Sequence, residues 1–157
     1  MSYLSVVTLQ DAKDFLRVDS DNNDDNNQIT QMIKSACSLV ERRTNHILYA
    51  RDKNYLFQDY TAYVYDYPIN SIEAPSSNVT EKEFELYNIY DTTNSNDTTL
   101  TLNVGYGSPS NVPDELKELV LNIVKFYYYE QEENKGSKGK LPIFLEQSMN
   151  MLKRFII

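Results

Sequence analysis

The sequence contains no tryptophan, one cysteine, one histidine and four glycines among its 157 residues. The single cysteine, Cys37, excludes an internal disulfide and is consistent with a reducing compartment. With His46 as the only histidine, no convincing Ser-His-Asp or Cys-His catalytic set can be assembled. A Gly-rich phosphate loop, an HExxH motif and a paired CxxC motif are also missing. We therefore predict a protein that is not an enzyme, with no catalytic residues, no metal ligands and no cofactor.

Positive charge and long apolar runs are scarce as well. The formal net charge is −8, which argues against tight binding to nucleic acid, because such binding needs clustered Lys and Arg side chains to displace counterions. An acidic surface repels a DNA duplex, so it suits a channel through which DNA passes better than a site that binds DNA. The N-terminal stretch is neither basic nor apolar for long enough to form a signal peptide or a membrane span. We expect no membrane association.

One short motif begins like a calcium site. Asp19, Asp21 and Asn23 have the spacing of the first ligands in an EF-hand loop. That loop requires Gly at its sixth position and a bidentate carboxylate at its twelfth. Asp24 and Thr30 occupy these positions here. We therefore interpret residues 19–27 as a solvated acidic turn that caps the next helix.

Two helices are predicted before residue 46. Thr8 can cap a helix from Leu9 to about Arg17, and Asp11 at the third helical position resembles the second half of a capping box. A longer helix is predicted from about Asp25 to Thr44, because apolar residues recur along one of its faces. Asn45 is a plausible stop for this helix.

The stretch from residue 47 to residue 104 is rich in Tyr, Val, Ile, Thr and Phe, and clusters of turn-forming residues interrupt it. Branched and aromatic side chains favour strands, since they pack well on a pleated surface. The clearest strand is 98–104, with Leu100, Leu102 and Val104 on one face. We predict short antiparallel strands in hairpins, at 55–57, 62–67, 84–90 and 98–104, with turns at 67–70, 75–78 and 92–97.

Tyrosine is the abundant aromatic residue, with 13 copies, most of them between Tyr49 and Tyr129. The ring of a tyrosine packs while its hydroxyl stays hydrated or hydrogen-bonded, so tyrosines suit half-buried sheet faces and interfaces. We expect these residues to be structural.

A long central helix is predicted from Val112 to Glu133. Pro113 and acidic residues open it, which suits the positive end of the helix dipole. Its main apolar stripe leaves out Leu121, Phe126 and Tyr128, so the helix is apolar around more of its circumference than one small core requires. Either the rest of the chain surrounds this helix or another chain covers part of it. We predict that Leu121, Phe126 and Tyr128 lie at an interface between subunits.

The last helix is expected from Ile143 to about Phe155, after a basic linker at 134–140. One apolar stripe runs from Leu145 to Ile156 and a second lies beside it. Two stripes on a terminal helix indicate a surface that receives a partner, and packing on the chain's own core is the alternative. The residues predicted to contact a partner are Phe144, Met151, Phe155, Ile156 and Ile157.

Together these elements predict an α+β fold, in which a mainly helical body of four helices carries an antiparallel β insertion between the second and third helices. The chain length suits one domain. Its parts are a helical hairpin at 1–46, the β insertion at 47–104, the central helix at 112–133 and a C-terminal helix at 141–157.

Several short stretches occur in an order typical of a known family. They are 7–19 with its acidic turn, the end of the second helix at 40–44, 67–72, Gly105-Tyr106 followed by 112–117, 128–130 and Leu141-Pro142. In this order they resemble the head–tail connector proteins of long-tailed double-stranded DNA bacteriophages, also called head-completion or adaptor proteins. The Tyr-rich strand region is longer than the hairpin typical of that family.

The resemblance implies a structural virion protein that forms a closed ring, twelvefold in that family, under the portal of the head. Such a ring extends the DNA channel and provides a platform for tail attachment. Its partners would be further copies of itself, the portal protein, tail-side neck or stopper proteins, and genomic DNA that passes without sequence-specific contacts. The protein would be made in the cytoplasm of the bacterial host and would end in the neck of the virion. The C-terminal residues named above would then face the portal or an adjacent ring.

Two alternatives stay open. A stopper or tail-completion ring of the same conduit would have similar features, and pull-down with portal protein against tail-tube protein would separate the two. A monomeric binding module would instead use the Tyr-rich strands to hold a sugar or a peptide.

Overall fold

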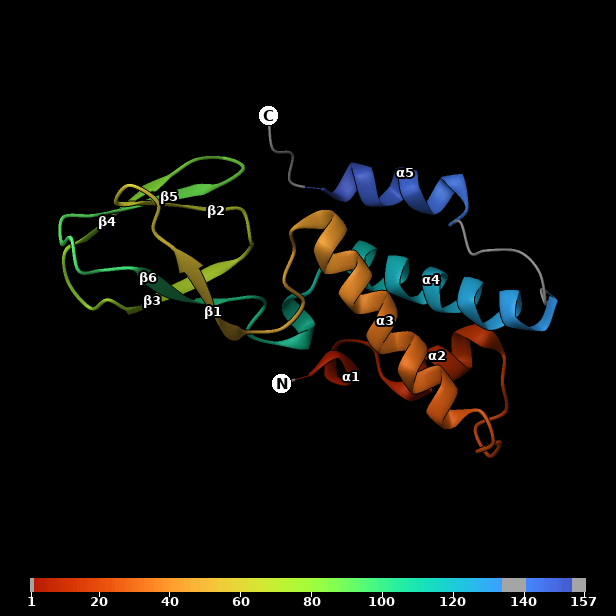
Figure 1. The fold of residues 1–157 in the computed structure, drawn as a ribbon. Helices are drawn as coiled ribbons and strands as arrows, with labels where there is room; N and C mark the ends of the chain where they lie inside the picture. Colours follow the sequence, from red (N-terminus) through yellow and green to blue (C-terminus); the bar gives the residue numbers. More distant parts are fainter. Residues whose placement is uncertain (1, 134–140, 154–157) are drawn as a thin grey trace.

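The computed structural model describes residues 2–133 and 141–153 of the chain. Within them, five α-helices gather at one end of the molecule and two small β-sheets lie at the other (Figure 1). The chain enters the sheets after its third helix and leaves them before its fourth. The predicted α+β fold with a β insertion is therefore confirmed.

The helices end close to the predicted residues, with two exceptions. They are α1 (Tyr3–Val6), α2 (Leu9–Leu16), α3 (Asn26–Thr44), α4 (Asp114–Glu133) and α5 (Ile143–Leu152), with a short 3-10 turn η1 (Pro109–Asn111) before α4. Helix α1 was not predicted, since a single turn is too short to show an apolar period. Helix α5 is shorter than expected, because Lys153 already has an extended backbone that stops the helical ladder.

The predicted cap of α2 and the predicted stop of α3 are confirmed, whereas the prediction that the acidic turn caps α3 is wrong, because Asp25 at the start of α3 makes no capping hydrogen bond. The Thr8 hydroxyl accepts a hydrogen bond from the Asp11 backbone N–H at 3.0 Å. The Asp11 carboxylate accepts one in return from the Thr8 N–H at 2.9 Å, which completes the capping box. At the end of α3, Asn45 has a left-handed φ of 62° and donates its N–H to the Glu41 carbonyl. Asn tolerates this conformation better than most residues, which explains the stop.

The acidic turn between α2 and α3 is organised around a buried ammonium group. Lys13 is only 2% exposed, and its Nζ donates to the backbone carbonyls of Ser20 at 3.0 Å and Asn22 at 2.6 Å. Asp19, Asp21 and Asp24 of the turn are exposed to solvent. Among the described residues, no group of three or more His, Cys, Asp or Glu side chains could hold a metal ion. A lysine of the chain itself therefore holds this turn together.

The β insertion consists of six short strands in two antiparallel sheets. One sheet has the order β1-β6-β3 and the other β2-β5-β4. The bounds are β1 (Arg51–Leu56), β2 (Thr61–Val64), β3 (Ile69–Ala74), β4 (Val79–Glu83), β5 (Asn88–Thr92) and β6 (Thr99–Val104). Strands β4 and β5 pair with each other across a tight turn, whereas β1, β2 and β3 pair with strands far along the chain.

Several of the predicted strand boundaries are wrong: β2 ends at Val64 rather than at residue 67, and neither β3 nor β4 was predicted as a strand. The expected strand at 84–90 contains a turn, closed by a hydrogen bond from the Phe84 N–H to the Tyr87 carbonyl at 3.0 Å, that separates β4 from β5. The expected turn at 67–70 overlaps the start of β3, whose Ile69 and Ile72 pack toward the interior of the sheets. Pairing with β6 overrides the local turn signal of Pro68 and Asn70.

The two sheets face each other across a small apolar core of their own. Leu100, Leu102 and Val104 of β6 are completely buried there, as the alternation of this strand predicts. Val64 and Tyr90 face them from the other sheet. Because one face of each sheet is used in this core, the other face of each points outward.

A second and larger apolar core lies among the helices. Helix α4 packs against α2, α3 and α5, and its Ile123 and Val124 are completely buried. Other helices of the same chain therefore explain why α4 is apolar on several sides. No helix within the described residues is long and apolar enough to cross a membrane.

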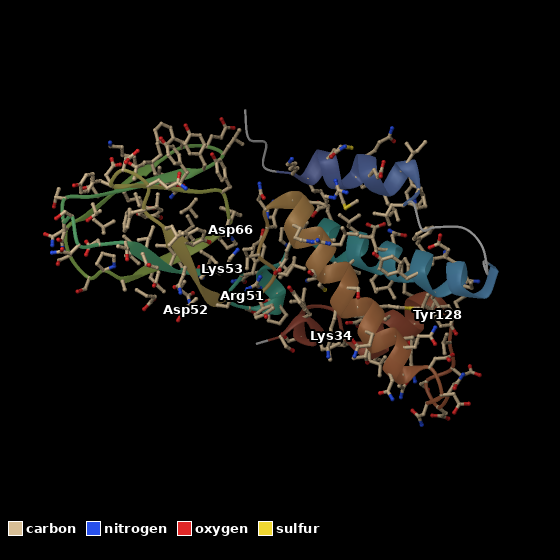
Figure 2. All side chains as sticks on the ribbon, in the orientation of Figure 1. Lys34, Arg51, Asp52, Lys53, Asp66 and Tyr128 are labelled. Carbon is tan, nitrogen blue, oxygen red and sulfur yellow. The ribbon has the colours of Figure 1, made fainter. Side chains whose placement is uncertain are left out.

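The helices and sheets are joined through one buried carboxylate. Glu41 of α3 is 6% exposed and accepts two hydrogen bonds from the Arg51 guanidinium, at 2.7 and 2.9 Å. It also accepts the backbone N–H of Leu48 at 2.8 Å and the hydroxyl of Tyr3 at 2.7 Å. Arg51 begins β1, at the end of the sheets nearest the helices (Figure 2). We call this region, residues 45–51 with 104–106 and the Glu41 side chain, the joint.

Candidate assembly surfaces

Helix α5 divides its apolar residues between the protein core and the outside. Leu145 and Met149 are buried in the helical core. Phe144 and Met151, which the sequence predicts to contact a partner, are 58% and 84% exposed. The first apolar stripe therefore packs on the chain's own core, and the second stays uncovered in this chain. Phe155, Ile156 and Ile157, predicted for the same contact, lie outside the described residues.

A groove of about 380 Å³ runs between α4 and α5. Phe144 and Met151 lie along it with Leu119, Leu145 and Leu152, and carboxylates from α4 border it. The exposed stripe and this groove form one continuous apolar surface with an acidic edge.

The residues predicted for contact between subunits lie on different sides of α4. Leu121 lines a cleft of about 630 Å³ that α4 shares with the N-terminal helices and Phe15. Phe126 and Tyr128 are half-buried and pack against the helical core. The Tyr128 hydroxyl donates to the Asp25 carboxylate at 2.9 Å. Contacts within the chain therefore account for much of Phe126 and Tyr128, and Leu121 is the member of the set that faces an open cleft.

Tyrosine hydroxyls are repeatedly paired with carboxylates. Four such pairs, at 2.6–2.9 Å, join residues that are 9 to 103 positions apart: Tyr3 with Glu41, Tyr55 with Asp66, Tyr90 with Glu81, and Tyr128 with Asp25. Burial first, and then the hydrogen bond to the carboxylate, raises the pKa of Tyr3, Tyr55 and Tyr90 well above the usual tyrosine range. These hydroxyls stay protonated and act as donors. The abundance of tyrosine and of acidic residues thus has a shared structural use.

The residues that would matter first for catalysis are engaged in the fold. The Nδ1 atom of His46 lies 2.9 Å from the Tyr106 hydroxyl, and its ring meets Tyr67 edge-on in the joint. Cys37 is completely buried in the helical core, and burial raises the pKa of its thiol to about 12. His46 and Cys37 lie in different parts of the molecule and form no catalytic set.

One exposed aromatic group was not singled out from the sequence. Tyr63 and Phe84 are 55% and 43% exposed, and both lie on the outer side of the sheet β2-β5-β4. Tyr65 and Tyr87 are their half-buried neighbours, and the rings of Phe84 and Tyr87 stack at 5.0 Å. The alternation of Tyr63 and Tyr65 with buried Ala62 and Val64 is the signal that could have identified this face.

Comparisons with known proteins give a match in structure only. No family model and no curated protein matches the sequence. A chain of the "Virion of native gene transfer agent (GTA) particle" matches with a TM-score of 0.75 and 12% identity, over 100% of this chain and 94% of that chain. A chain of the "Neck of empty GTA particle computed with C6 symmetry" matches with a TM-score of 0.73 and 13% identity, over 97% of this chain and 91% of that chain. The fold is one found in gene transfer agent particles.

The extent of these matches bears on the strand region. Coverage of 97–100% of this chain includes the sheets as well as the helices. The six-stranded region is therefore part of the shared fold.

Proposed function

We propose that this protein is a structural component of the neck of a phage-like particle. The observation that carries the proposal is the fold, shared over 97% of this chain and 91% of a chain from the neck of a gene transfer agent. Nearly complete coverage of both chains means that a whole protein, rather than one common motif, is alike. The uncovered apolar stripe of α5 supports the same conclusion, since an assembled particle provides a surface to cover it.

Within the neck, the role we propose is that of the head–tail connector. The chain acts as one domain that assembles with further copies into a closed ring under the portal protein, extends the DNA channel and carries tail-side neck proteins. A neck computed with C6 symmetry is compatible with rings of six or of twelve copies, because a twelvefold ring contains the sixfold axis. The formal net charge of −8 suits a conduit that must not hold DNA.

The contact with the portal or an adjacent ring is assigned to α5. Phe144 and Met151 are exposed on one side of this helix while Leu145 and Met149 anchor its other side in the core. Phe155, Ile156 and Ile157 would extend the same contact. Aromatic residues and Met are enriched at the cores of protein interfaces.

The deciding experiment measures the mass of the purified protein, alone and mixed with portal protein, by light scattering and negative-stain imaging. The expected result is a ring, or a monomer that becomes a ring on the portal. A monomer that does not bind the portal protein would refute the connector role. The exposed tyrosines would then be examined as a binding site for a sugar or a peptide.

The α5 assignment needs point substitutions rather than removal of the helix, because Leu145 and Met149 belong to the core. We expect Phe144→Asp with Met151→Asp to keep the fold and to lose assembly on the portal. Asn150→Asp is the matched control, since Asn150 is an exposed polar residue of the same helix. Portal binding by the double variant at the strength of the control would refute the assignment.

The alternative position in the same conduit is a stopper or tail-completion ring. The similar chains come from a virion and a neck, which suits either ring. Binding to the portal and not to the tail-tube protein supports the connector, and the reverse pattern supports the stopper.

A further inference from the structure

The outer side of the sheet β2-β5-β4 is an ordered grid of side chains. The strand register places Tyr63 opposite Ile89 and Thr61 opposite Asp91. Just beyond the paired residues, the rings of Tyr65 and Tyr87 lie 5.7 Å apart. Phe84 stacks on Tyr87 at the end of the grid. Strand β4 adds Lys82 beside Ile89, with its Nζ 2.6 Å from the Asp91 carboxylate. We call this surface the aromatic face.

The outer side of the sheet β1-β6-β3 has a different chemistry. Hydrogen bonds between side chains cross the strands on it, from Asn103 to Asp52 at 2.7 Å, from Thr101 to Asn54 at 2.9 Å and from Asn70 to Asn103 at 2.9 Å. These bonds fix the positions of the amides on the sheet. Exposed Glu73 adds a second carboxylate, and none of the described side chains on this side is a cation. We call this surface the amide face.

The two faces lie on opposite sides of the sandwich. Leu100 and Leu102 of one sheet meet Val64 and Tyr90 of the other in a shared core, so the aromatic face and the amide face point in opposite directions. All the described helices lie to one side of the sheets, and none covers either face (Figure 1). A closed ring needs two different surfaces on each subunit, because every contact in it is heterologous.

We infer that the sandwich forms the lateral contact of the ring, with the aromatic face of one copy on the amide face of the next. The occupant of each face is therefore a second copy of this chain. Charge supports the pairing, since the aromatic face carries an ion pair of Lys82 with Asp91, in which the lysine side chain is 57% exposed. The amide face carries the carboxylates of Asp52 and Glu73 and no described cation. The amides of the opposite face provide hydrogen-bond partners for the exposed Tyr63 hydroxyl, whose ring can pack at the same time. This inference rests on the proposed ring and assigns a use to the strand region.

The size of the faces predicts how the contact behaves. Three strands about 4.8 Å apart, each with about five residues at a rise of about 3.3 Å, span roughly 230 Å². A stable complex buries about 800 Å² on each partner. The sheet contact is therefore one part of the lateral interface, and free subunits should not dimerise through it. It forms when a closing ring or the portal holds neighbours side by side.

Cysteine cross-linking tests the pairing directly. Leu56 and Thr80 are exposed on the amide and aromatic faces and make none of the side-chain contacts described above. A mixture of Leu56→Cys and Thr80→Cys subunits, assembled on portal protein and treated with a short bis-maleimide, should give cross-linked dimers. Each variant assembled alone should give none, because equivalent faces point away from each other in a heterologous contact. Native Cys37 is buried, so wild-type protein reports the background.

A pair of substitutions of opposite sign tests the charge pairing. Tyr63→Glu places a carboxylate opposite Asp52 and Glu73, whereas Tyr63→Lys places a cation there. We expect the Glu variant to need about tenfold more protein than the Lys variant for half-maximal ring assembly, because like charges across an interface repel. Both changes are at an exposed position, so thermal unfolding should be unaffected.

The outcomes separate the inference from the function on which it rests. Wild-type protein that forms rings on the portal, without cross-links between Leu56→Cys and Thr80→Cys, would overturn the sheet contact and leave the connector role standing. Cross-links within a single variant would overturn it in favour of a symmetric dimer. Wild-type protein that neither forms rings nor binds the portal would refute both.

Discussion

Replacing Gly105 with alanine should destabilise the joint between helices and sheets. Gly105 follows β6 and has a φ of +109°, a conformation that L side chains rarely adopt. A Cβ atom built on it would lie 2.3 Å from the carbonyl oxygen of Tyr49 and 2.9 Å from the Cγ2 atom of Ile47. The first of these is a backbone atom, which cannot rotate away as the end of a flexible side chain can.

The backbone at Gly105 is also fixed from both sides. Its N–H donates to the Pro68 carbonyl at 2.7 Å, and its own carbonyl accepts from the Asn70 amide at 2.8 Å. Relief of the clash would break one of these bonds. Backbone strain costs about 1–3 kcal/mol and overpacking costs about 1–3 kcal/mol. We therefore expect Gly105→Ala to lower the free energy of unfolding by about 2–6 kcal/mol.

Urea denaturation followed by circular dichroism measures this loss, and Gly107→Ala provides the matched control. No atom lies within 4 Å of a Cβ built on Gly107, so the control should stay within about 0.5 kcal/mol of wild type. If Gly105→Ala is as stable as the control, the joint is not held in the geometry described here.

Three further predictions concern buried polar groups. Glu41→Gln should lower the free energy of unfolding by about 2 kcal/mol, because the amide cannot accept all the hydrogen bonds of the carboxylate. Lys34→Ala, at an exposed position of the same helix, should change the free energy of unfolding little. Equal effects of the two substitutions in urea denaturation would contradict this role of Glu41. Lys13→Met should cost about 1–2 kcal/mol by leaving two loop carbonyls without their donor, and should speed hydrogen exchange in the turn between α2 and α3. Unchanged exchange there would show that the turn does not need the ammonium. Stability should also fall as the pH rises above about 10: the unfolded chain then loses tyrosine protons that Tyr55 and Tyr90 keep in the folded state, where their pKa is raised. Denaturation at pH 9 and above, with Tyr55→Phe as the comparison, checks this, and an equal pH dependence of the two proteins would count against it.

The helices could be predicted from the sequence because their signals are local. The capping box of Thr8 and Asp11 joins residues three apart, and Asn45 stops α3 through a hydrogen bond to a residue four before it. The buried face of β6 could likewise be predicted from its own alternation. In each case the pattern lies within one short window of the chain, so the local sequence is enough to predict the structure.

The candidate surfaces could be predicted only in part. The second stripe of α5 was correctly expected to be separate from the first, and Phe144 and Met151 are exposed. The same type of pattern selected Tyr128, whose hydroxyl is bound to Asp25, 103 residues earlier in the chain. An apolar or aromatic residue off the main stripe stays exposed only if no distant segment of the chain packs against it. The sequence of a single helix does not show which distant segments pack against that helix.

The sequence by itself determined the four longer helices, the cap of α2, the stop of α3 and the presence of strands between them. Tertiary structure alone decided how the strands pair and where the outer faces lie. Arg51 pairs with Val104, and Ile69 pairs with the same residue from the other side, so β6 joins two strands that are distant from it in the chain. Tertiary structure likewise places Arg51 beside Glu41 in the joint. A helix forms its hydrogen bonds with residues four positions away, whereas a strand takes its partner from the whole chain, according to which pairing buries the most apolar surface.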